Sequence, residues 1–261
     1  MQPKKSLGQN FLTSIPARMA IVAAGNLTTT DTVLEIGPGK GFLTRGLLDS
    51  GASVVALEKD RELLPILEET FSPEIKNKKF TIVEGDALLF EPLECKPLAG
   101  DYKLIANIPY YITGAILSRY LSHAHQPTHM VVLVQKEVAE RVVARDGKES
   151  ILSLAVKVYG DPKIVYRVKR GSFNPIPNVD SAVLSIENIS RKNFRSAKHE
   201  ENFFTVVKAG FSHKRKFLIS NLKEKLPEIN WQNLFIKNTL NEKVRAEDVP
   251  LTIWIQISFE I

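Results

Sequence analysis

Short apolar runs rich in β-branched residues alternate with helix-like stretches through the first half of the chain. Between the runs, apolar residues recur at three- and four-residue spacing, as they do on one face of a helix. Continuous apolar strands separated by helices are typical of a parallel sheet that is covered on both faces. The expected strands are Thr32–Ile36, Ser53–Glu58, Phe80–Glu84, Lys103–Asn107 and Met130–Gln135, and the expected helices include Phe42–Ser50, Arg61–Thr70 and Ile112–His123. The pattern predicts an α/β protein with an open, doubly wound, Rossmann-like sheet.

The pattern changes twice farther along the chain. Lys163–Val168 and Ala182–Ile186 lie on either side of a Pro-containing loop, which predicts an antiparallel pair that ends the sheet. After Glu187 the strand-like runs stop. Amphipathic stretches follow at Glu201–Ala209, Lys216–Lys225 and Trp231–Lys237. We therefore expect two domains, residues 1–187 with the sheet and residues 188–261 as a small helical domain.

Positive charge is concentrated in the second of these domains. The 261 residues carry a net charge of +6. Residues 1–187 hold 22 Lys and Arg against 21 Asp and Glu, whereas residues 188–261 hold 13 against 8. An excess of this kind favours a polyanion such as RNA as partner, because each neutralised phosphate releases counterions. A basic surface without a partner is the open alternative.

The composition argues against several other classes of protein. No apolar stretch approaches the ~20 residues that span a bilayer, so no membrane association is expected. The N-terminus lacks the apolar segment of a secretory signal, and the single cysteine, Cys95, has no internal partner. The five histidines are scattered, which predicts no metal site. We expect a cytoplasmic monomer.

A glycine-rich turn follows the first expected strand. Glu35-Ile36-Gly37-Pro38-Gly39-Lys40-Gly41 lets a ligand approach the backbone closely, above all at Gly37. Pro38 and the spacing depart from the dinucleotide pattern G-x-G-x-x-G. The acidic Glu35 beside the turn suits a cationic, amine-bearing ligand better than a pyrophosphate.

Polar residues end the next strands in order. Glu58 stands about 21 positions after Gly37, where a carboxylate commonly accepts ribose hydroxyls. Asp86 is placed to accept from an adenine amine, with a helix N-cap as the alternative. Ligands of such sheets bind at the carboxyl ends of the strands, where Asn107 also arrives. Together these residues indicate S-adenosylmethionine as a methyl donor.

The tetrapeptide Asn107-Ile108-Pro109-Tyr110 suits the binding of a flat base that carries an amine. Asn107 offers an amide oxygen, and Pro109 keeps Ile108 extended so that its carbonyl becomes a second acceptor. Tyr110 offers a ring for stacking. Two acceptors on one exocyclic amine would turn its lone pair toward an incoming methyl group. A strand that ends in a Pro-Tyr turn is the structural alternative.

With these motifs the chain resembles the ribosomal RNA adenine dimethyltransferase family, the bacterial KsgA/RsmA enzymes. The resemblance covers nearly the whole length and includes Lys5-Ser6-Leu7-Gly8-Gln9-Asn10-Phe11-Leu12, Gln135 to Arg141 and Phe173 to Val183. It implies a class I methyltransferase fold, with Asn10 and Leu12 touching the cofactor. It also implies that Phe173 stacks on the adenine opposite Tyr110; a loop aromatic that fills the core is the alternative.

The resemblance implies dimethylation of two adjacent adenosines near the 3′ end of small-subunit rRNA, in the immature 30S subunit. The basic cluster His213-Lys214-Arg215-Lys216 resembles a family segment that helps hold RNA. Two alternatives stay open. One is the related large-subunit rRNA adenine methylase of macrolide resistance, and the other is a non-catalytic RNA-binding assembly factor with the same fold.

Overall fold

The computed structural model describes Lys4 and residues 8–261, and the chain folds into two compact units. The first contains the chain up to Ala139 together with Asp161–Ile189. The second contains Glu140–Gly160 and Ser190–Ile261. Residues 140–160 thus belong with the helical unit, although their position in the sequence placed them with the sheet.

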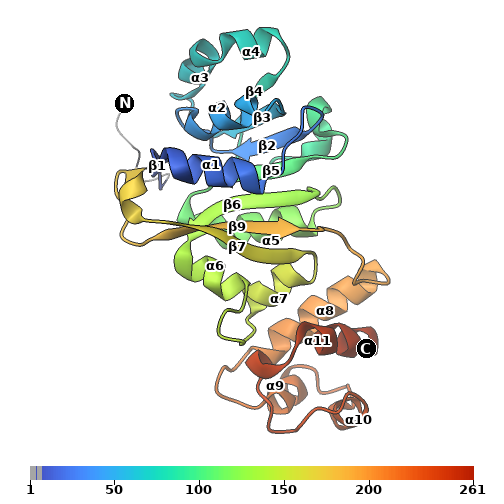
Figure 1. Ribbon diagram of the computed structural model, residues 1–261. Helices are drawn as coiled ribbons and strands as arrows, with labels where there is room; N and C mark the ends of the chain where they lie inside the picture. Colours follow the sequence, from blue (N-terminus) through green and yellow to red (C-terminus); the bar gives the residue numbers. More distant parts are fainter. Residues whose placement is uncertain (1–3, 5–7) are drawn as a thin grey trace. The chain divides into compact units, whose positions relative to one another are not determined.

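A seven-stranded, mostly parallel sheet forms the first unit, as predicted (Figure 1). Its strand order is β4-β3-β2-β5-β6-β9-β7. The five strands from β4 to β6 run parallel, and β9 is antiparallel to both of its neighbours. The strands are β2 (Thr32–Ile36), β3 (Ser53–Glu58), β4 (Phe80–Glu84), β5 (Lys103–Asn107), β6 (His129–Gln135), β7 (Asp161–Val168) and β9 (Ser181–Glu187).

The register of the parallel strands brings the ends of β2, β3 and β4 to the same edge. Ile36 lies opposite Leu57, and Glu58 lies opposite Glu84. Strand β5 lies on the other side of β2 and pairs with it in parallel. The residues that follow these four strands are therefore close in space although they are far apart in sequence.

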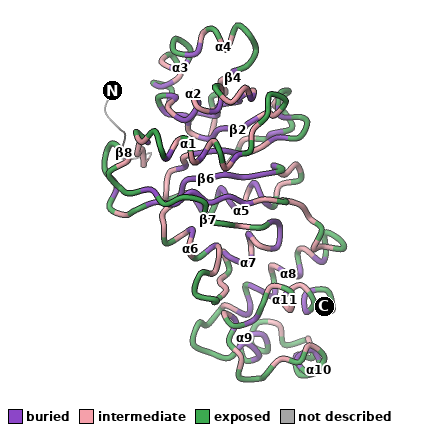
Figure 2. The backbone as a smooth tube through the Cα atoms, in the orientation of Figure 1, coloured by how far each residue is buried: buried purple, intermediate pink, exposed green. Residues whose placement is uncertain are grey.

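Helices cover the sheet, and its central strands are buried along most of their length (Figure 2). Helix α1 (Ile15–Ala24) begins at Ser14, whose hydroxyl accepts from Ala17 N at 3.3 Å, and it packs against β6, β9 and β7. Burial of consecutive strand residues fits a sheet that is covered on both faces. The other helices of the first unit are α2 (Phe42–Asp49), α3 (Leu64–Thr70), α4 (Ser72–Lys76) and α5 (Thr113–Ser122), and α6 (Lys136–Val142) follows β6 directly.

A small antiparallel pair lies outside the main sheet. Strand β1 (Phe11–Leu12) pairs with β8 (Phe173–Asn174), so that Leu12 lies opposite Phe173. Thr13 extends the pairing, because its backbone N–H donates to the Ser172 carbonyl at 2.8 Å. The start of the chain is thereby attached to the loop between β7 and β9.

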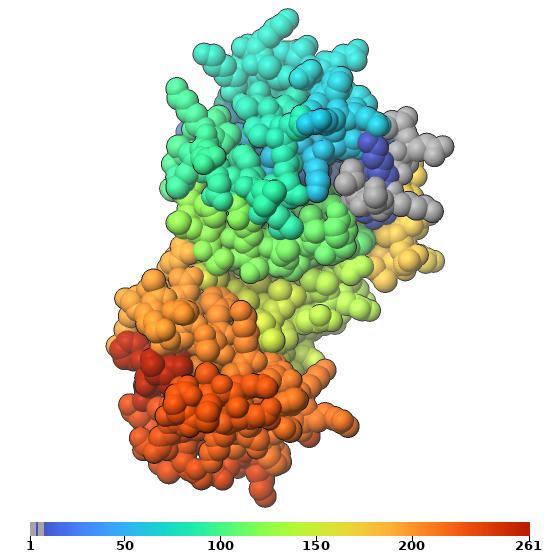
Figure 3. Space-filling view, turned by 180° about the vertical axis from the view of Figure 1, so that it is seen from behind, coloured from blue at the N-terminus to red at the C-terminus, as the bar shows by residue number. Residues whose placement is uncertain are grey.

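The second unit is helical, as predicted. It contains α7 (Ile151–Lys157), α8 (Ala197–Gly210), α9 (Leu218–Lys225), α10 (Trp231–Lys237) and α11 (Leu251–Phe259). The orange and red segments from α8 to α11 pack into one body (Figure 3). The unusually apolar end of the chain is α11, which buries Trp254 and Ile257 and packs against α8.

Three contacts explain why residues 140–160 belong to this unit. The Tyr159 hydroxyl donates to Glu200 on α8, and Asn193 Nδ2 donates to the Val158 carbonyl at 2.7 Å. The backbone N–H of Glu149 donates to the Glu247 carbonyl at 2.8 Å.

Within the described part of the chain, no helix has the length and apolar content to cross a membrane.

Candidate active site

A cavity of about 730 Å³ opens at the carboxyl ends of the parallel strands. Segments 8–13, 35–43, 57–59, 85–88 and 107–112 line it, together with single residues such as Asn174. Nine of the ten predicted site residues are among them: Asn10, Leu12, Gly37, Glu58, Asp86, Asn107, Ile108, Pro109 and Tyr110. The tenth, Phe173, is not. The order of the strands thus brings residues from five segments of the sequence to one place.

The glycine turn is shaped for a close ligand at one position and for packing at another. Gly37 has φ +66°, and a Cβ built there would meet no atom within 4 Å, so its backbone faces open space. At Gly41, with φ +80°, a Cβ would lie 2.3 Å from the Phe71 ring. Gly37 leaves room beside the cavity, whereas Gly41 allows the turn to pack against α3.

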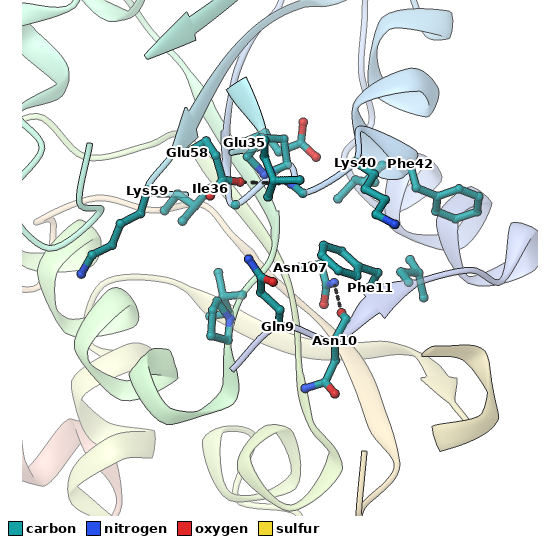
Figure 4. A pocket seen from close by; sticks show the side chains of 18 of the residues that line it. Gln9, Asn10, Phe11, Glu35, Ile36, Lys40, Phe42, Glu58, Lys59 and Asn107 are labelled. Atoms are coloured by element: carbon teal, nitrogen blue, oxygen red, sulfur yellow. Dashed lines mark hydrogen bonds between the residues drawn. The ribbon is translucent and has the colours of Figure 1, made fainter. Parts of the chain in front are cut away.

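Glu35 does not have the role that its sequence position suggested. Its side chain is buried, and Oε2 accepts from the Thr44 hydroxyl at 2.6 Å. Burial, aided by the charge of Glu58, raises the pKa of this carboxyl to about 8. Figure 4 shows the carboxyl pointing away from Gln9 and Asn107 across the cavity. Burial therefore favours the protonated form of Glu35, and its carboxyl is bound to Thr44.

Glu58 ends β3 with both carboxylate oxygens held by backbone donors. Oε2 accepts from Gly39 N at 3.2 Å, and Oε1 accepts from Asp60 N at 2.8 Å. Burial raises the pKa of Glu58, while these hydrogen bonds act in the opposite direction. The bonds connect the end of β3 to the glycine turn after β2, and they fix the carboxylate at the wall of the cavity.

Asp86 takes the capping role that its sequence position left open, and its second oxygen pairs with a lysine. Oδ1 accepts from Leu88 N at 2.8 Å, which caps the turn that follows β4. Oδ2 accepts from Lys59 Nζ at 2.8 Å, and this bond is the main reason that the pKa of Asp86 is lowered. Lys59 also lines the cavity. Sequence reasoning missed it, although its place directly after Glu58 at a strand end was a usable signal.

The amide of Asn107 is held in a defined orientation. Its Nδ2 donates to the Asn10 carbonyl at 3.1 Å (Figure 4). Because one end of the amide is bound in this way, Oδ1 is the end that stays available as an acceptor. Among Lys4 and residues 8–261, neither Asn107 Oδ1 nor the Ile108 carbonyl accepts a hydrogen bond. Two neighbouring acceptors thus lack a partner at this wall.

Pro109 and Tyr110 connect the end of β5 to the segment that follows it. Pro109 has φ −58° and ψ 133°, which turns the chain from β5 into the short helix Tyr110–Ile112. The Tyr110 hydroxyl is hydrogen-bonded to Ser181 Oγ at 2.7 Å, and burial raises its pKa, so the phenol stays neutral. Tyr111 also lines the cavity and is 65% exposed. It is a second aromatic at the same wall that sequence reasoning did not select.

The expectation for Phe173 is corrected by the structure. Its side chain is only 3% exposed and belongs to the hydrophobic core, opposite Leu12 in the β1–β8 pair. The ring thus takes the alternative that the sequence left open, because pairing with β1 turns it inward. Its neighbour Asn174 lines the cavity instead.

Among the described residues, no group of three His, Cys, Asp or Glu is placed to hold a metal ion.

Comparisons with known proteins agree along the whole chain. The family described as Ribosomal RNA adenine dimethylase matches residues 1–261. A Ribosomal RNA small subunit methyltransferase A of Dehalococcoides mccartyi is 37% identical, over 100% of this chain and 89% of that protein. One of the same name from Fusobacterium nucleatum is 36% identical, over 97% of this chain and 96% of that protein.

Solved structures with the same fold include two adenine or rRNA methyltransferases. A dimethyladenosine transferase from Plasmodium falciparum superimposes with a TM-score of 0.80 at 25% identity, over 96% of each chain. The 23S rRNA methyltransferase ErmE superimposes with a TM-score of 0.77 at 25% identity, over 96% of this chain and 98% of its own. The match over all 261 residues shows that this chain belongs to the ribosomal RNA adenine dimethylase family.

Proposed function

We propose that this protein transfers methyl groups from S-adenosylmethionine to N6 of two adjacent adenosines in the 3′-terminal hairpin loop of small-subunit rRNA, two groups to each. One observation carries the proposal. A single cavity holds the glycine turn, the buried carboxylate of Glu58 and the acceptors of Asn107 and Ile108, which have no hydrogen-bond partner in the part of the chain that the structure describes. A donor side and an acceptor side therefore lie next to each other.

The cavity fits the methyl donor in size and in chemistry. Its volume lies within the ~300–1,000 Å³ typical of small-molecule sites, and the open backbone at Gly37 admits a ligand. Glu58 would accept the ribose hydroxyls and Asp86 the adenine amine, while Asn10 and Leu12 would form the wall at the methionine end. When bound, S-adenosylmethionine supplies an electrophilic methyl group on a sulfonium. Asn107 borders both this region and the base.

The acceptor side orients the target amine. Asn107 Oδ1 and the Ile108 carbonyl would each accept one N6 hydrogen, while the base stacks on Tyr110. The N6 lone pair would then form the new C–N bond while the C–S bond breaks, the sulfur would keep the electron pair of that bond as a neutral thioether, and the methylated N6 would release its proton to water. Because the donor is already electrophilic, positioning is the main task, and it can contribute ~7–11 kcal/mol. Phe173 is assigned to packing that holds β1 in place.

The proposed partner is rRNA of the immature small subunit, bound by a monomer. A target base has to leave its stack to enter the cavity, which favours a loop over a paired helix. The relatives at 36–38% identity are named for the small subunit. ErmE is named for 23S rRNA, so the large-subunit enzyme stays the alternative at 25% identity. We propose that the basic helical unit contacts the RNA.

The test is methyl incorporation into immature small subunits, with mass spectrometry of the rRNA from cells that lack the gene. Asn107→Ala should lower the rate at least ~100-fold, as loss of one preorganised polar group does in other enzymes. Asn178→Ala is the matched control, because Asn178 is exposed in the loop before β9. Full activity of Asn107→Ala would contradict the proposed acceptor side.

Two other outcomes would favour the alternatives. If the methyl groups are lost only from large-subunit adenines, the protein is the large-subunit enzyme. If the wild-type protein binds RNA but neither it nor Asn107→Ala methylates it, the protein is a non-catalytic assembly factor.

A further inference from the structure

A buried carboxylate outside the cavity wall holds the start of the chain. Asp60 is 3% exposed, and its Oδ1 accepts from Lys4 Nζ at 2.7 Å. Its Oδ2 accepts from Gln9 Nε2 at 2.9 Å. The backbone N–H of Lys4 donates to Gln9 Oε1 at 2.8 Å. Lys4, Gln9 and Asp60 therefore form a closed set of three contacts, which we call the Asp60 anchor.

The same residue also orients a wall of the cavity. The backbone N–H of Asp60 donates to Glu58 Oε1 at 2.8 Å, while the backbone N–H of Glu62 donates to Asp60 Oδ1 at 3.2 Å. Burial alone would raise the pKa of Asp60, but the hydrogen bonds from Lys4, Gln9 and Glu62 outweigh it and lower the pKa. Asp60 is therefore an anion whose charge depends on these partners.

Residues 8–12 are attached at two ends that differ in kind. At one end, β1 is bound to β8 through backbone hydrogen bonds. At the other end, the contacts of Lys4 and Gln9 with Asp60 that the described residues make run through side chains. Between these ends, residues 8–12 line the cavity, and the Asn10 carbonyl accepts from Asn107. Figure 4 shows Gln9 reaching from the side of Asn10 toward Glu58.

The two ends also differ in how easily they separate. The Lys4 side chain is 35% exposed and that of Asp60 is 2% exposed, so water reaches the ammonium before the carboxylate. Lys4 also pairs with the exposed Glu62 at 2.9 Å, which offers the ammonium a partner when it leaves Asp60.

We propose that Asp60 is a positioning residue, which through Lys4 and Gln9 holds residues 8–12 against the bound methyl donor. Release of this anchor, with β1 still paired, lets the donor and its demethylated product exchange. The identity of the ligand rests on the proposed function; the anchor itself rests on the contacts of Asp60. Because Lys4 does not line the cavity, its substitution changes the anchor without removing a group from the site.

The experiment uses the full chain and S-adenosylhomocysteine, the demethylated product, as the probe. Lys4→Met should speed probe dissociation about fivefold and raise KM for the donor by a similar factor, the lower range of couplings between linked sites. The kcat at saturating donor should stay within about twofold, since in this proposal the anchor acts on ligand exchange and not on the reacting atoms. Lys4→Arg should restore the wild-type values, because it keeps a cation with several donors.

Lys163→Met is the matched control. Lys163 pairs with Glu187 at 2.6 Å on the edge strand β7, and its side chain is 53% exposed, against 35% for Lys4. It should leave probe dissociation unchanged. An equal effect of Lys163→Met and Lys4→Met would mean that loss of any surface ion pair loosens the site, and it would overturn the proposal.

A double-mutant cycle separates the anchor from general destabilisation. In an Asp60→Asn background, Lys4→Met should have no further effect on dissociation, because its partner charge is already gone. A full fivefold effect in that background would overturn the proposal, as would unchanged dissociation in Lys4→Met alone. If the wild-type protein does not bind the probe at all, the proposed function fails instead, which is a distinct result.

Discussion

Three carboxylates around the cavity and Glu224 in the helical unit are held in opposite ways. Around the cavity, Glu35, Glu58 and Asp60 are all at most 5% exposed, and each is hydrogen-bonded to a defined donor. In the helical unit, the exposed Glu224 pairs with Lys216 and His213, and its pKa is lowered to about 2 by these partners and by Lys225.

The difference shows which charged groups stabilise the fold and which remain available to bind a partner. Buried carboxylates must keep their partners, because an unpaired buried charge is costly. Exposed pairs are screened by water and salt, and they exchange partners easily. In the cluster 213–216, two of the four residues, His213 and Lys216, are bound to Glu224. Lys214 and Arg215 have no hydrogen-bonded or ionic partner among the described residues.

The largest expected effect concerns the stability of the buried side. Because Glu35 has a pKa of about 8 in the folded chain and an ordinary pKa of 4.5 when exposed to water, the folded state holds its proton more tightly. The stability that this proton provides is complete below pH 4.5 and is lost as the pH rises through 8. Relative to Glu35→Gln, wild-type protein should lose roughly 3–5 kcal/mol over this range.

Thermal and denaturant unfolding of both proteins from pH 4.5 to pH 8.5 measures this difference. Gln keeps an acceptor for Thr44, so the hydrogen bond remains. Glu84→Gln, at the exposed end of β4, should show no such pH dependence. A constant difference between wild type and Glu35→Gln across the range would show that Glu35 is ionised throughout.

The next effect concerns binding at the same side. Glu58→Gln should weaken binding of S-adenosylhomocysteine about 10- to 100-fold, because hydrogen bonds to a charged group contribute ~1.5–3 kcal/mol. Isothermal titration calorimetry measures it. Glu84→Gln serves again as the control, since Glu84 lies opposite Glu58 in the register of β3 and β4 but does not line the cavity. Equal affinities of all three proteins would remove Glu58 from the ligand site.

A smaller effect is expected on the exposed side. Lys214→Glu with Arg215→Glu should weaken RNA binding and reduce the slope of log K against log salt by about 1–2, as expected for up to two lost phosphate contacts. Lys223→Glu with Lys243→Glu changes the charge of the same unit equally and is the control. Should the two double variants show the same slopes, the cluster 213–216 would not be a specific contact.

The smallest effect is expected at Glu224. Glu224→Gln should leave the melting temperature unchanged, because exposed ion pairs contribute little to stability. It should strengthen RNA binding slightly at low salt, since Lys216 loses its competing partner. Fluorescence anisotropy with an rRNA fragment measures the change. A lower melting temperature would place Glu224 with the structural carboxylates of the first unit.

The strands were the most predictable part of the fold. The predicted β2, β3, β4 and β5 have the bounds seen in the structure, because each is a continuous apolar run ended by a turn. The antiparallel β7 and β9 were also predicted, with shorter bounds. The two-residue strands β1 and β8 were not, since their pairing joins segments about 160 residues apart and leaves no periodic signal.

Within the site, residue type was readable but the direction of the side chain was not. Glu58 and Asn107 stand at strand ends, and register alone brings them to the cavity. Glu35 and Phe173 each stand next to site residues in the sequence. The Glu35 carboxyl nevertheless bonds to Thr44, and the Phe173 ring packs into the core. The direction of Phe173 depends on Leu12, which is distant in the chain, and that of Glu35 depends on how α2 packs beside β2.

The sequence by itself determined the order of strands and helices along the chain, the residues at the strand ends and the family. Those features depend on local periodicity and on spacing along the chain. Only the tertiary structure decided that Asp60 binds Lys4 and Gln9 and that Asp86 forms an ion pair with Lys59. It also decided that residues 140–160 belong to the helical unit. The reason is physical. A buried polar group bonds to whichever partner the packed chain brings near, and the spacing of residues along the sequence does not specify how distant segments pack.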